Sequence, residues 1–570
     1  KLTVVEYGAI FLSIALAVYI LIDQERLITR HAFFDPVMPF DYVFTLIALL
    51  LVLEATRRVV GYPLMLVSAI FLLYIYVGQY LPGLFHAPSF GFDYVAEITL
   101  LTTSSIYGLV LGVAASYVIM FCLFGSFLTR VGAADFFFDG SMKLAGRARG
   151  GIAKTSVVSS ALFGMINGDP ISNTITTGNF TIPTMKRANY PAHLAAATET
   201  ASSCGGTILP PVMGSVAFVM AEVVGLKYGT VMKLALIPGL LYYLAVFIGI
   251  DSMARKFNLR GVSAEELPKF GSITQWGRPF LITVGPVIWL VTRILKGSTP
   301  PQAAGESIAI MIIFSLLLGG IKRIKFKDML DALEEGATNC LLVGIATAAA
   351  GIVVGAIKLT GVGPKFTSAV MLLAENNLPI ALLLAALVTI ILGMGMSITP
   401  TYILASSLVA PGLIELGTPA LAVHMFIVYY AAMATMTPPV ALSAYTSAGI
   451  AGADPFKVGF TAVRLGIVAY LIPFVFIYRP GLLMFDTVLV NIITVVFVAL
   501  GVVAIAYGLA PIFIKHNTTL DKCMLILAAL MLWFPNNIVN IVGAVLMAIV
   551  VIIQIFMRKE EVATENALPS

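Results

Sequence analysis

Charged residues are scarce in this sequence, where Asp, Glu, Lys and Arg make up 11% of 570 residues. Soluble domains carry roughly 25% of these residues, so the composition argues against a soluble globular protein. Hydrophobic residues reach 59%, and nearly uncharged stretches close to or above the length that spans a bilayer, about 20 residues, recur along the chain. We therefore expect an all-α protein that crosses the lipid bilayer many times, with about 15 membrane elements.

Cysteine, histidine and nucleotide-binding motifs are also scarce. The four cysteines show no CxxC spacing, which predicts free thiols and no metal site built on them. The five histidines are scattered and form no ligand cluster of the kind that a membrane-embedded enzyme needs, so we expect no enzymatic activity. No GxxxxGK[ST] motif is present, which disfavours ATP-driven pumping. The net charge of +5 reflects basic loops, expected on the cytoplasmic side, and not a nucleic-acid partner.

What the sequence does contain is a proline pattern that occurs twice. In each set the four prolines are separated by 8, 19 and 1 residues, and the second set lies 228 residues after the first, because 411 − 183 = 228. The first set is Pro183, Pro191, Pro210 and Pro211, and the second is Pro411, Pro419, Pro438 and Pro439. In so apolar a chain the repeat predicts a transporter with two related halves, which binds substrate and ions on broken helices at their interface.

Two short apolar stretches precede each proline pair. In the first half they cover about Thr155–Ile166 and Ile171–Met185, and a polar tip joins them. Each is too short to cross a hydrocarbon core of about 30 Å, which favours a re-entrant hairpin at about 151–188. The second half repeats the pattern and predicts hairpin two at about 379–414.

The proline pairs predict a broken helix in each half. A proline removes the hydrogen bond to the carbonyl four residues earlier, so the pairs are expected to free four carbonyls for a small cation. These belong to Gly206, Thr207, Ala434 and Thr435. Half-helix N-termini after Thr174 and Thr401 would attract an anion. The simpler alternatives are helix kinks with hydroxyls bonded to their own backbone, or a passive channel, although no repeated filter sequence is present.

The first repeat resembles the large membrane subunit of the TRAP transporters. The stretch Ser159–Glu222 carries Thr-Thr-Gly-Asn-Phe-Thr-Ile-Pro-Thr-Met-Lys-Arg and Gly-Gly-Thr-Ile-Leu-Pro-Pro-Val-Met-Gly, and the second half carries Met-Thr-Pro-Pro-Val-Ala-Leu-Ser-Ala-Tyr445. More narrowly, the chain resembles fused permeases of the TAXI branch, which join the small and large membrane subunits in one chain. The likeness covers about residues 100–480.

This resemblance implies an inverted-repeat, elevator-type secondary transporter in the cytoplasmic membrane of a bacterium or archaeon. A periplasmic TAXI-type binding protein would deliver a small organic acid, either a dicarboxylate or an amino acid. By analogy with the family, a Na⁺ gradient would drive uptake. No covalent cofactor is implied, and we expect a monomer. The alternative is an ion-coupled anion transporter of a related elevator fold that needs no binding protein.

The resemblance also implies two cation sites, each between one hairpin and one unwound helix. The first maps onto Ser172, Asn173, Thr174, Gly205, Gly206 and Thr207. The second maps onto Gly395, Ser397, Thr399, Thr401, Thr435 and Thr437, next to the carbonyl of Ala434.

Two carboxylates stand near these predicted sites. Relatives usually have a serine-rich tip in hairpin one, whereas this chain has Asn167-Gly-Asp-Pro170. Asp169 therefore either binds a cation, carries a proton in a proton-coupled cycle, or caps the helix that follows. Glu199 either takes part in coupling or accepts hydrogen bonds from neighbouring scaffold. Asn167 and the two carboxylates are the candidate substrate or coupling residues.

The chain is expected to divide into four parts. Residues 1–85 form a small-subunit-like region with about three spans, 86–260 the first repeat with hairpin one, 261–480 the second repeat with hairpin two, and 481–570 C-terminal membrane helices and a tail. The charged stretch Lys322–Glu335 predicts an amphipathic helix at the membrane interface.

Overall fold

The computed structural model describes residues 4–263, 265, 267–268, 273–319, 323–375, 377–514 and 516–567. Within these residues all regular elements are helices, and the one β-bridge joins Ile512 to His516. Eleven of the described helices are long and apolar enough to cross a membrane, and four shorter apolar helices accompany them. The all-α, many-span architecture expected from the composition is therefore confirmed.

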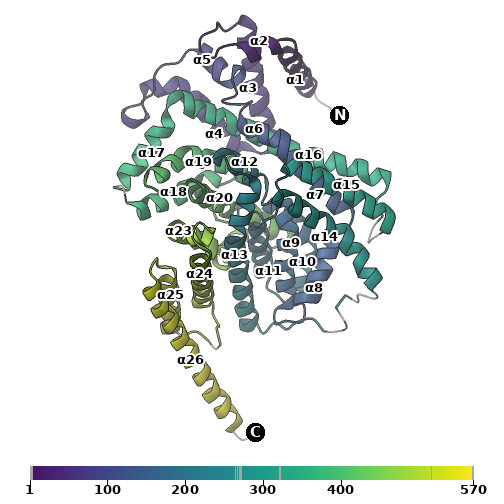
Figure 1. Ribbon diagram of the computed structural model, residues 1–570, viewed down its shortest axis with the longest axis vertical. Coiled ribbons are helices and arrows are strands. Elements are labelled where there is room, and N and C mark those ends of the chain that lie inside the picture. The colour runs from purple at the N-terminus through teal and green to yellow at the C-terminus, as the bar shows by residue number, and fades with distance from the viewer. Residues whose placement is uncertain are drawn as a thin grey trace.

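The N-terminal region lies at one end of the molecule, opposite the C-terminus (Figure 1). It consists of α1 (Val4–Ile22), the short α2 (Gln24–Thr29), α3 (Pro39–Val59) and α4 (Tyr62–Val77). Three of these are long enough to span a membrane, α4 together with the turn after it, which is the number expected for residues 1–85. Helices α3 and α4 pack against α16 (Phe326–Thr360) of the central part.

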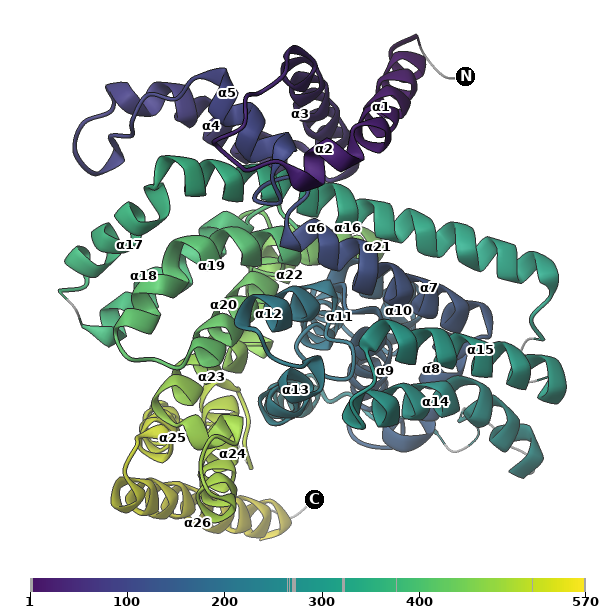
Figure 2. The ribbon, with the colours of Figure 1, turned by 45° about the horizontal axis from the view of Figure 1, so that its top comes forward.

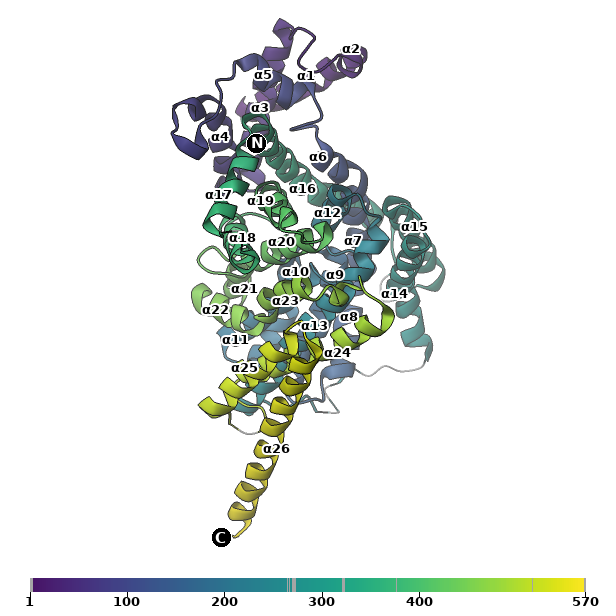
Figure 3. The ribbon, with the colours of Figure 1, turned by 60° about the vertical axis from the view of Figure 1, so that its left-hand side comes forward.

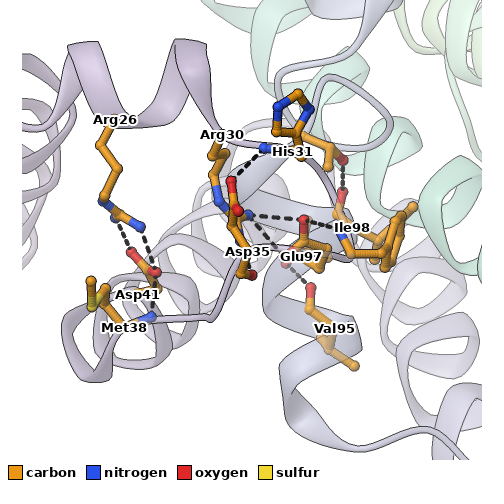
Figure 4. Close-up of polar contacts among 12 residues, drawn as sticks. Arg26, Arg30, His31, Asp35, Met38, Asp41, Val95, Glu97 and Ile98 are labelled. Carbon is orange, nitrogen blue, oxygen red and sulfur yellow. Dashed lines mark hydrogen bonds and ion pairs between the residues drawn. The ribbon is translucent and has the colours of Figure 1, made fainter.

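A buried ion pair ties this region to the central part (Figure 4). The Arg30 guanidinium donates to both carboxylate oxygens of Glu97, at 2.9 and 2.8 Å, and both side chains are 3% exposed. Arg30 follows α2, and Glu97 begins a π-helical segment, η3 (Glu97–Leu101). The Phe33 N–H also donates to Glu97, at 2.9 Å. The pair therefore fixes the α2–α3 connection onto η3.

We expect Glu97→Ala to lower the free energy of unfolding by about 3–5 kcal/mol, because it leaves the Arg30 charge buried without its partner. Glu54→Ala is the matched control, since Glu54 pairs with Arg58 at 39% exposure, and it should change stability far less than Glu97→Ala. Thermal unfolding of the purified protein measures both. Equal effects of the two variants would show that the buried pair does not hold the region in place.

The central part shows the sequence repeat as repeated structure. Helices α10 (Pro170–Arg187) and α11 (Ala192–Gly206) have counterparts 228 residues later in α19 (Ile398–Glu415) and α20 (Ala420–Ala434), because 398 − 170 and 420 − 192 both equal 228. Pro183 and Pro411 lie inside α10 and α19, while Pro191 and Pro419 cap α11 and α20. The peptide bonds within both proline pairs are cis.

Other helices complete the two halves. The first also contains α8 (Ala133–Ala145), α9 (Gly151–Asn167), α12 (Ser215–Val224) and α13 (Tyr228–Lys256). The second also contains α17 (Val362–Leu373), α18 (Leu378–Gly393), α21 (Leu442–Ala451), α22 (Pro455–Leu465) and α23 (Val468–Tyr478). Helices α9 and α10 form the first helix pair, and α18 and α19 form the second; their bounds match the predicted hairpin ranges closely.

A layer of long helices flanks these halves (Figure 2). Helices α7 (Ile119–Arg130), α15 (Pro300–Leu318) and α16 run side by side, and α14 (Ile273–Leu295) packs on α15. Short α5 (Phe92–Ala96), α6 (Leu109–Val113) and the π-helical η4 (Ala114–Val118) lead into α7. The stretch predicted as an amphipathic helix, Lys322–Glu335, is helical from Phe326, where it forms the start of the 35-residue α16. Lys322 lies outside the described residues.

The C-terminal helices leave the central part on the side away from α1 (Figure 3). After a short 3-10 turn, η5 (Pro480–Leu483), they are α24 (Val488–Leu509), α25 (Thr519–Trp533) and α26 (Asn537–Ala567). The chain therefore leaves the helical conformation between α24 and α25 and again between α25 and α26.

Candidate functional site

Polar tips of both helix pairs meet at one cavity of about 170 Å³. The first helix pair contributes the turn between α9 and α10, and the second contributes the start of α19. The break between α11 and α12 lies beside them, and α7 and α16 close the opposite side. Six predicted residues line this cavity: Asn167, Asp169, Ser172, Thr207, Ser397 and Thr399.

The cavity lining is acidic. Asp169 and Glu335 line it, and no Lys, Arg or His is among its lining residues in the described chain. Glu335 accepts a hydrogen bond from Arg130 at 2.9 Å. Asn339 and Thr129 face the cavity from the flanking layer. Sequence reasoning missed this side because α7 and α16 carry no repeat motif.

The residues of the first predicted cation site lie together around the start of α10 and the end of α11. Asn167 donates to the Ser172 hydroxyl at 2.9 Å, and Asn173 donates to the Ser160 carbonyl at 3.0 Å. The Thr207 hydroxyl is different, because it is buried in the lining and has no hydrogen-bond partner within the described chain. Buried hydroxyls normally have partners, so this orphan oxygen is suited to an ion or to substrate.

In the second predicted site, more of the hydroxyl groups are engaged in hydrogen bonds within the protein. The Thr399 and Ser215 hydroxyls lie 2.7 Å apart, and Thr401 donates to the Ser397 carbonyl at 2.9 Å. Thr437 bonds with the Tyr470 hydroxyl at 2.7 Å. Gly395 has a φ of +80°, which favours glycine at this tip. Gly395, Thr401, Ala434, Thr435 and Thr437 lie close behind the tip and are not among the cavity-lining residues.

The proline pairs do not leave all four expected carbonyls free, and that prediction was wrong for three of them. The Gly206 carbonyl accepts the Leu209 N–H at 3.4 Å, and the Ala434 carbonyl accepts the Thr437 N–H at 3.3 Å. The Thr435 carbonyl accepts the Ser443 N–H at 2.9 Å. Tight turns at the ends of both helices bond the Gly206 and Ala434 carbonyls, and the first turn of α21 bonds the Thr435 carbonyl. Each carbonyl keeps a second lone pair, so cation binding remains chemically open.

The first broken helix is interrupted at the proline pair. Helix α11 continues to Gly206, and α12 begins at Ser215. Gly206 allows this, because α11 crosses α9 there, and a Cβ on Gly206 would lie 2.5 Å from Gly164 Cα. Gly205 likewise faces a ring, with Tyr242 Cε1 2.5 Å from the position of a Cβ. Both glycines therefore permit close packing, and both belong to the first predicted cation site.

The two halves touch directly through hydroxyl groups. The hydroxyl oxygens of Thr174 and Ser443 lie 3.0 Å apart, and those of Thr200 and Ser447 lie 2.5 Å apart. These bonds join α10 and α11 of the first half to α21 of the second. The tips and breaks therefore belong to one packed unit.

Asp169 caps α10, which is one of the three alternatives that the sequence left open for this residue. Its carboxylate accepts the Ser172 N–H at 2.7 Å. We expect Asp169→Ala to cost about 1 kcal/mol through loss of the cap, while Asp169→Asn, another good N-cap, should cost only a few tenths. Thermal unfolding measures both. If the Asn variant is as unstable as the Ala variant, the negative charge and not the cap is what stabilises the tip.

Glu199 lies in a different setting, behind the cavity and fully buried. Five hydroxyls bond its carboxylate. One oxygen accepts from Ser160, Thr177 and Ser203 at 2.8, 2.5 and 3.1 Å, and the other from Ser156 and Thr181 at 2.6 Å each. We call these five residues the hydroxyl cage. They come from α9, α10 and α11 and so bind the first helix pair to the broken helix.

The sequence held a signal for this cage that was not used. Ser156 and Ser160, Thr177 and Thr181, and Glu199 and Ser203 are each four residues apart. Residues at that spacing share one face of a helix, so three polar pairs in apolar helices indicate a common polar centre.

Comparison with known proteins gives a family match. The profile of the family described as tripartite ATP-independent periplasmic transporter, DctM component, matches residues 47–492. The chain is 23% identical over 370 residues to a putative TRAP transporter large permease protein of Haemophilus influenzae, covering 64% of this chain and 84% of that protein. It is 22% identical over 378 residues to the C4-dicarboxylate TRAP transporter large permease protein DctM of Rhodobacter capsulatus, covering 62% and 80%.

A third relative and one solved structure add to this. The sialic acid TRAP transporter large permease protein SiaM of Vibrio cholerae is 23% identical over 357 residues, covering 62% of this chain and 80% of that protein. The crystal structure of the Alcanivorax borkumensis YdaH transporter is similar in fold, with a TM-score of 0.50 at 14% identity, over 78% of this chain and all of that one.

Proposed function

Because the chain belongs to the DctM family of tripartite ATP-independent periplasmic transporters, we propose that it is the membrane permease of a secondary transporter. It takes up a small organic acid from a soluble periplasmic binding protein and is not an enzyme. The observation that carries the proposal is the acidic cavity between the two helix-pair tips, within a chain of this family. Relatives named for C4-dicarboxylate and sialic acid support an organic acid as substrate, here a dicarboxylate or an amino acid.

The charge of the cavity supports coupling to a cation. Because Arg130 pairs with Glu335, an anionic substrate would meet the carboxylate of Asp169, which has no ion pair in the described chain, and no basic side chain among the lining residues, so it needs a co-bound positive charge to enter. The orphan hydroxyl of Thr207 and the N-termini of α10 and α19 are the groups suited to hold cation and anion. Na⁺ is the expected coupling ion, and the carboxyl groups of Asp169 and Glu199 make H⁺ the alternative coupling ion.

The packing supports an elevator mechanism, in which the first and second helix pairs are re-entrant hairpins. Helices α9–α12 and α18–α22, joined by the hydroxyl contacts between halves, would move as one body. The layer of α7 and α14–α16 would stay fixed, because the cavity lies between it and the moving tips. Substrate and ion would then cross together.

The remaining parts of the proposal concern organisation. Residues 1–85 act as a fused small subunit of the TAXI type, and the packing of α3 and α4 on α16 supports a fixed role for them. Residues 86–260 and 261–480 are the two repeats, and 481–570 are accessory helices. The protein works as a monomer in the bacterial or archaeal cytoplasmic membrane with a TAXI-type binding protein.

Uptake driven by imposed gradients tests the coupling. Vesicles carrying the full chain receive the loaded binding protein outside and an inward Na⁺ gradient, an inward H⁺ gradient, or neither. We expect accumulation with one of the two gradients and only equilibration without. Accumulation that is the same in all three conditions would contradict a cation-driven transporter.

A further inference from the structure

Helix α16 contains the repeat counterpart of α7. Helix α7 ends at Arg130, and the last turn of α16 carries Lys358 at the repeat offset, because 358 − 130 = 228. The same offset relates Ile119, the first residue of α7, to Thr347 of α16. The second copy of this helix is therefore the C-terminal part of α16.

Helix α7 runs antiparallel to α16. At the end of α7, Arg130 donates to Glu335 in the third turn of α16, at 2.9 Å. Ser105, which precedes α7 in the chain, lies instead beside Gly355 near the end of α16, where a Cβ would be 2.6 Å from Ser105 Cβ. Because the counterpart of α7 is part of α16 itself, the two copies run in opposite directions, which is the relation expected of an inverted repeat.

The cavity between the helix-pair tips reaches the surface at the start of α16. Glu335 lines the cavity, and its side chain is 39% exposed. Val118 and Ala346, which lie at the opposite end of the lining on α7 and α16, are buried. The cavity is therefore open toward the end of the membrane layer at which α7 stops and α16 begins.

The two ends of α16 lie at opposite membrane surfaces. Exposed basic residues precede the helix at Arg323, Lys325 and Lys327. Cytoplasmic loops are enriched in Lys and Arg, which assigns this end to the cytoplasm. Lys358 follows Asp331 by 27 residues, because 358 − 331 = 27, and so lies about 40 Å further along the helix. That length matches a bilayer with its headgroups, about 40–45 Å, so Lys358 lies at the outer surface.

The charges at corresponding positions of the two ends differ in sign. At the inner end the Arg130 guanidinium pairs with both Asp331, at 3.5 Å, and Glu335, at 2.9 Å, so two negative charges face one positive charge. The positions that correspond to these two carboxylates at the outer end are the neutral Thr103 and Tyr107, because 331 − 228 = 103 and 335 − 228 = 107. The inner cluster is therefore negative overall, and its outer counterpart contains no carboxylate.

Lys358 is available to an anion. Its side chain is exposed and makes no hydrogen bond or ion pair within the part of the chain that the structure describes. The Arg130 charge, by contrast, is already neutralised by its two carboxylates. An ammonium group without a partner can form a charge-assisted hydrogen bond with the carboxylate of an organic acid.

We propose that Lys358 lies at the outer mouth of the transport cavity and captures the anionic substrate there. The inference rests on the proposed function, in which the helix-pair tips move past the fixed α16. With the tips at the outer surface, the inverted repeat places the face of α16 that ends at Lys358 along the cavity, as the face of α7 that ends beside Arg130 lines it now. The substrate then enters past a positive mouth and leaves past a negative one. These charges change the rates of capture and release, while the ion gradient still drives accumulation.

Charge-selective labelling of two matched cysteine variants tests the mouths without substrate or binding protein. Ser126 lines the cavity four residues before Arg130, and its counterpart Val354 lies four residues before Lys358. Ser126→Cys or Val354→Cys is introduced into a full chain whose four native cysteines are replaced by alanine. Anionic and cationic methanethiosulfonate reagents that do not cross membranes are then added to one side of sealed vesicles with Na⁺ on both sides.

We expect Ser126→Cys to react from the inner side and faster with the cationic reagent. Val354→Cys should react from the outer side and faster with the anionic reagent. Adding Lys358→Gln should lower this anionic preference by about fivefold, because a unit charge about 8 Å away in water changes the two rates in opposite directions. Lys358→Arg, which keeps the charge, should keep the preference.

Lys296→Gln is the matched control for the loss of a lysine. Lys296 is exposed just before α15, and α15 ends close in sequence to the cytoplasmic Arg323, so Lys296 lies at the outer surface as well. This variant should leave the reagent preference at Val354→Cys unchanged. If Val354→Cys does not react from outside, or if Lys358→Gln affects it no more than Lys296→Gln, the proposal is overturned. A lysine that only stabilises the end of α16 would give this second result.

Uptake from the loaded binding protein tests the capture step. Lys358→Gln should slow uptake severalfold at limiting substrate and keep the maximal rate, and the difference should vanish near 1 M salt, where the screening length is about 3 Å. An unchanged rate at limiting substrate would show that Lys358 does not capture the substrate. Absence of uptake in the wild type, with the labelling pattern intact, would instead contradict the proposed transport function alone.

Discussion

Gly206→Val should unfold the first half of the protein and abolish uptake. The added Cβ alone would lie 2.5 Å from Gly164 Cα and 2.7 Å from the Gly164 carbonyl carbon. Both are backbone atoms in the interior of α9, so they cannot move aside as a flexible side chain can. Overpacking usually costs about 1–3 kcal/mol, and a β-branched side chain against a backbone should reach about 3 kcal/mol or more. Thermal unfolding and the yield of monodisperse protein measure the loss.

Gly344→Ala is the matched control for that experiment. Gly344 also lies inside a long helix, α16, and a Cβ there would meet nothing within 4 Å. Alanine is the better helix former by about 0.5–1 kcal/mol, so this variant should be as stable as the wild type or more stable. If Gly206→Val is tolerated as well as Gly344→Ala, α9 and α11 do not cross as closely as the structure has them.

Thr207→Val should weaken cation binding about 10- to 150-fold while leaving the fold intact. The valine keeps the shape of threonine and removes a buried hydroxyl that bonds to nothing in the described chain. Stability without ion should therefore stay equal or rise, since an unpartnered polar group is replaced by an apolar one. A bond from a neutral group to a charged one contributes about 1.5–3 kcal/mol, which corresponds to the expected loss of affinity.

Thr198→Val controls for this substitution. Thr198 lies on α11, which Thr207 caps, is equally buried, and its hydroxyl also lacks a hydrogen-bond partner in the described chain, yet it does not line the cavity. Sodium-induced thermal stabilisation at fixed pH should be reduced in Thr207→Val and unchanged in Thr198→Val. The same sodium response in both variants would remove Thr207 from the cation site.

The repeated proline spacing predicted the arrangement of the core of this protein well. Pro191 and Pro419 cap equivalent helices, and the helix pairs begin and end close to where the short apolar stretches did, because turn residues and apolar length are local properties of a sequence. The family match agrees with the resemblance that these motifs suggested.

Other features depend on contacts between distant segments and could not be read in the same way. The end of α11 at Gly206 depends on the crossing with α9, and the carbonyls of Gly206 and Thr435 depend on which N–H groups turn back toward them. The cation-site residues on the second helix pair remain predictions, as does the direct role of Asp169 beyond its cap. The hydroxyl cage was visible only as three spaced polar pairs whose common partner was unknown.

The two halves differ most at Glu199, and this difference is what the repeat makes informative. A fold built twice from the same helices carries a caged carboxylate in one copy and Ile427 in the other. Any difference in ion preference between the two predicted cation sites is therefore expected to originate in the first helix pair.

Dependence of uptake on the binding protein tests the central claim most directly. The binding protein is the one encoded by a neighbouring gene, and the substrate is the compound that co-purifies with it. Vesicles carrying the full chain are placed under the cation gradient that supports accumulation. They then receive this substrate, with or without the binding protein outside. We expect accumulation only when both the gradient and the binding protein are present. Accumulation that needs the gradient and is equally fast without the binding protein would contradict the account and favour a transporter that works alone.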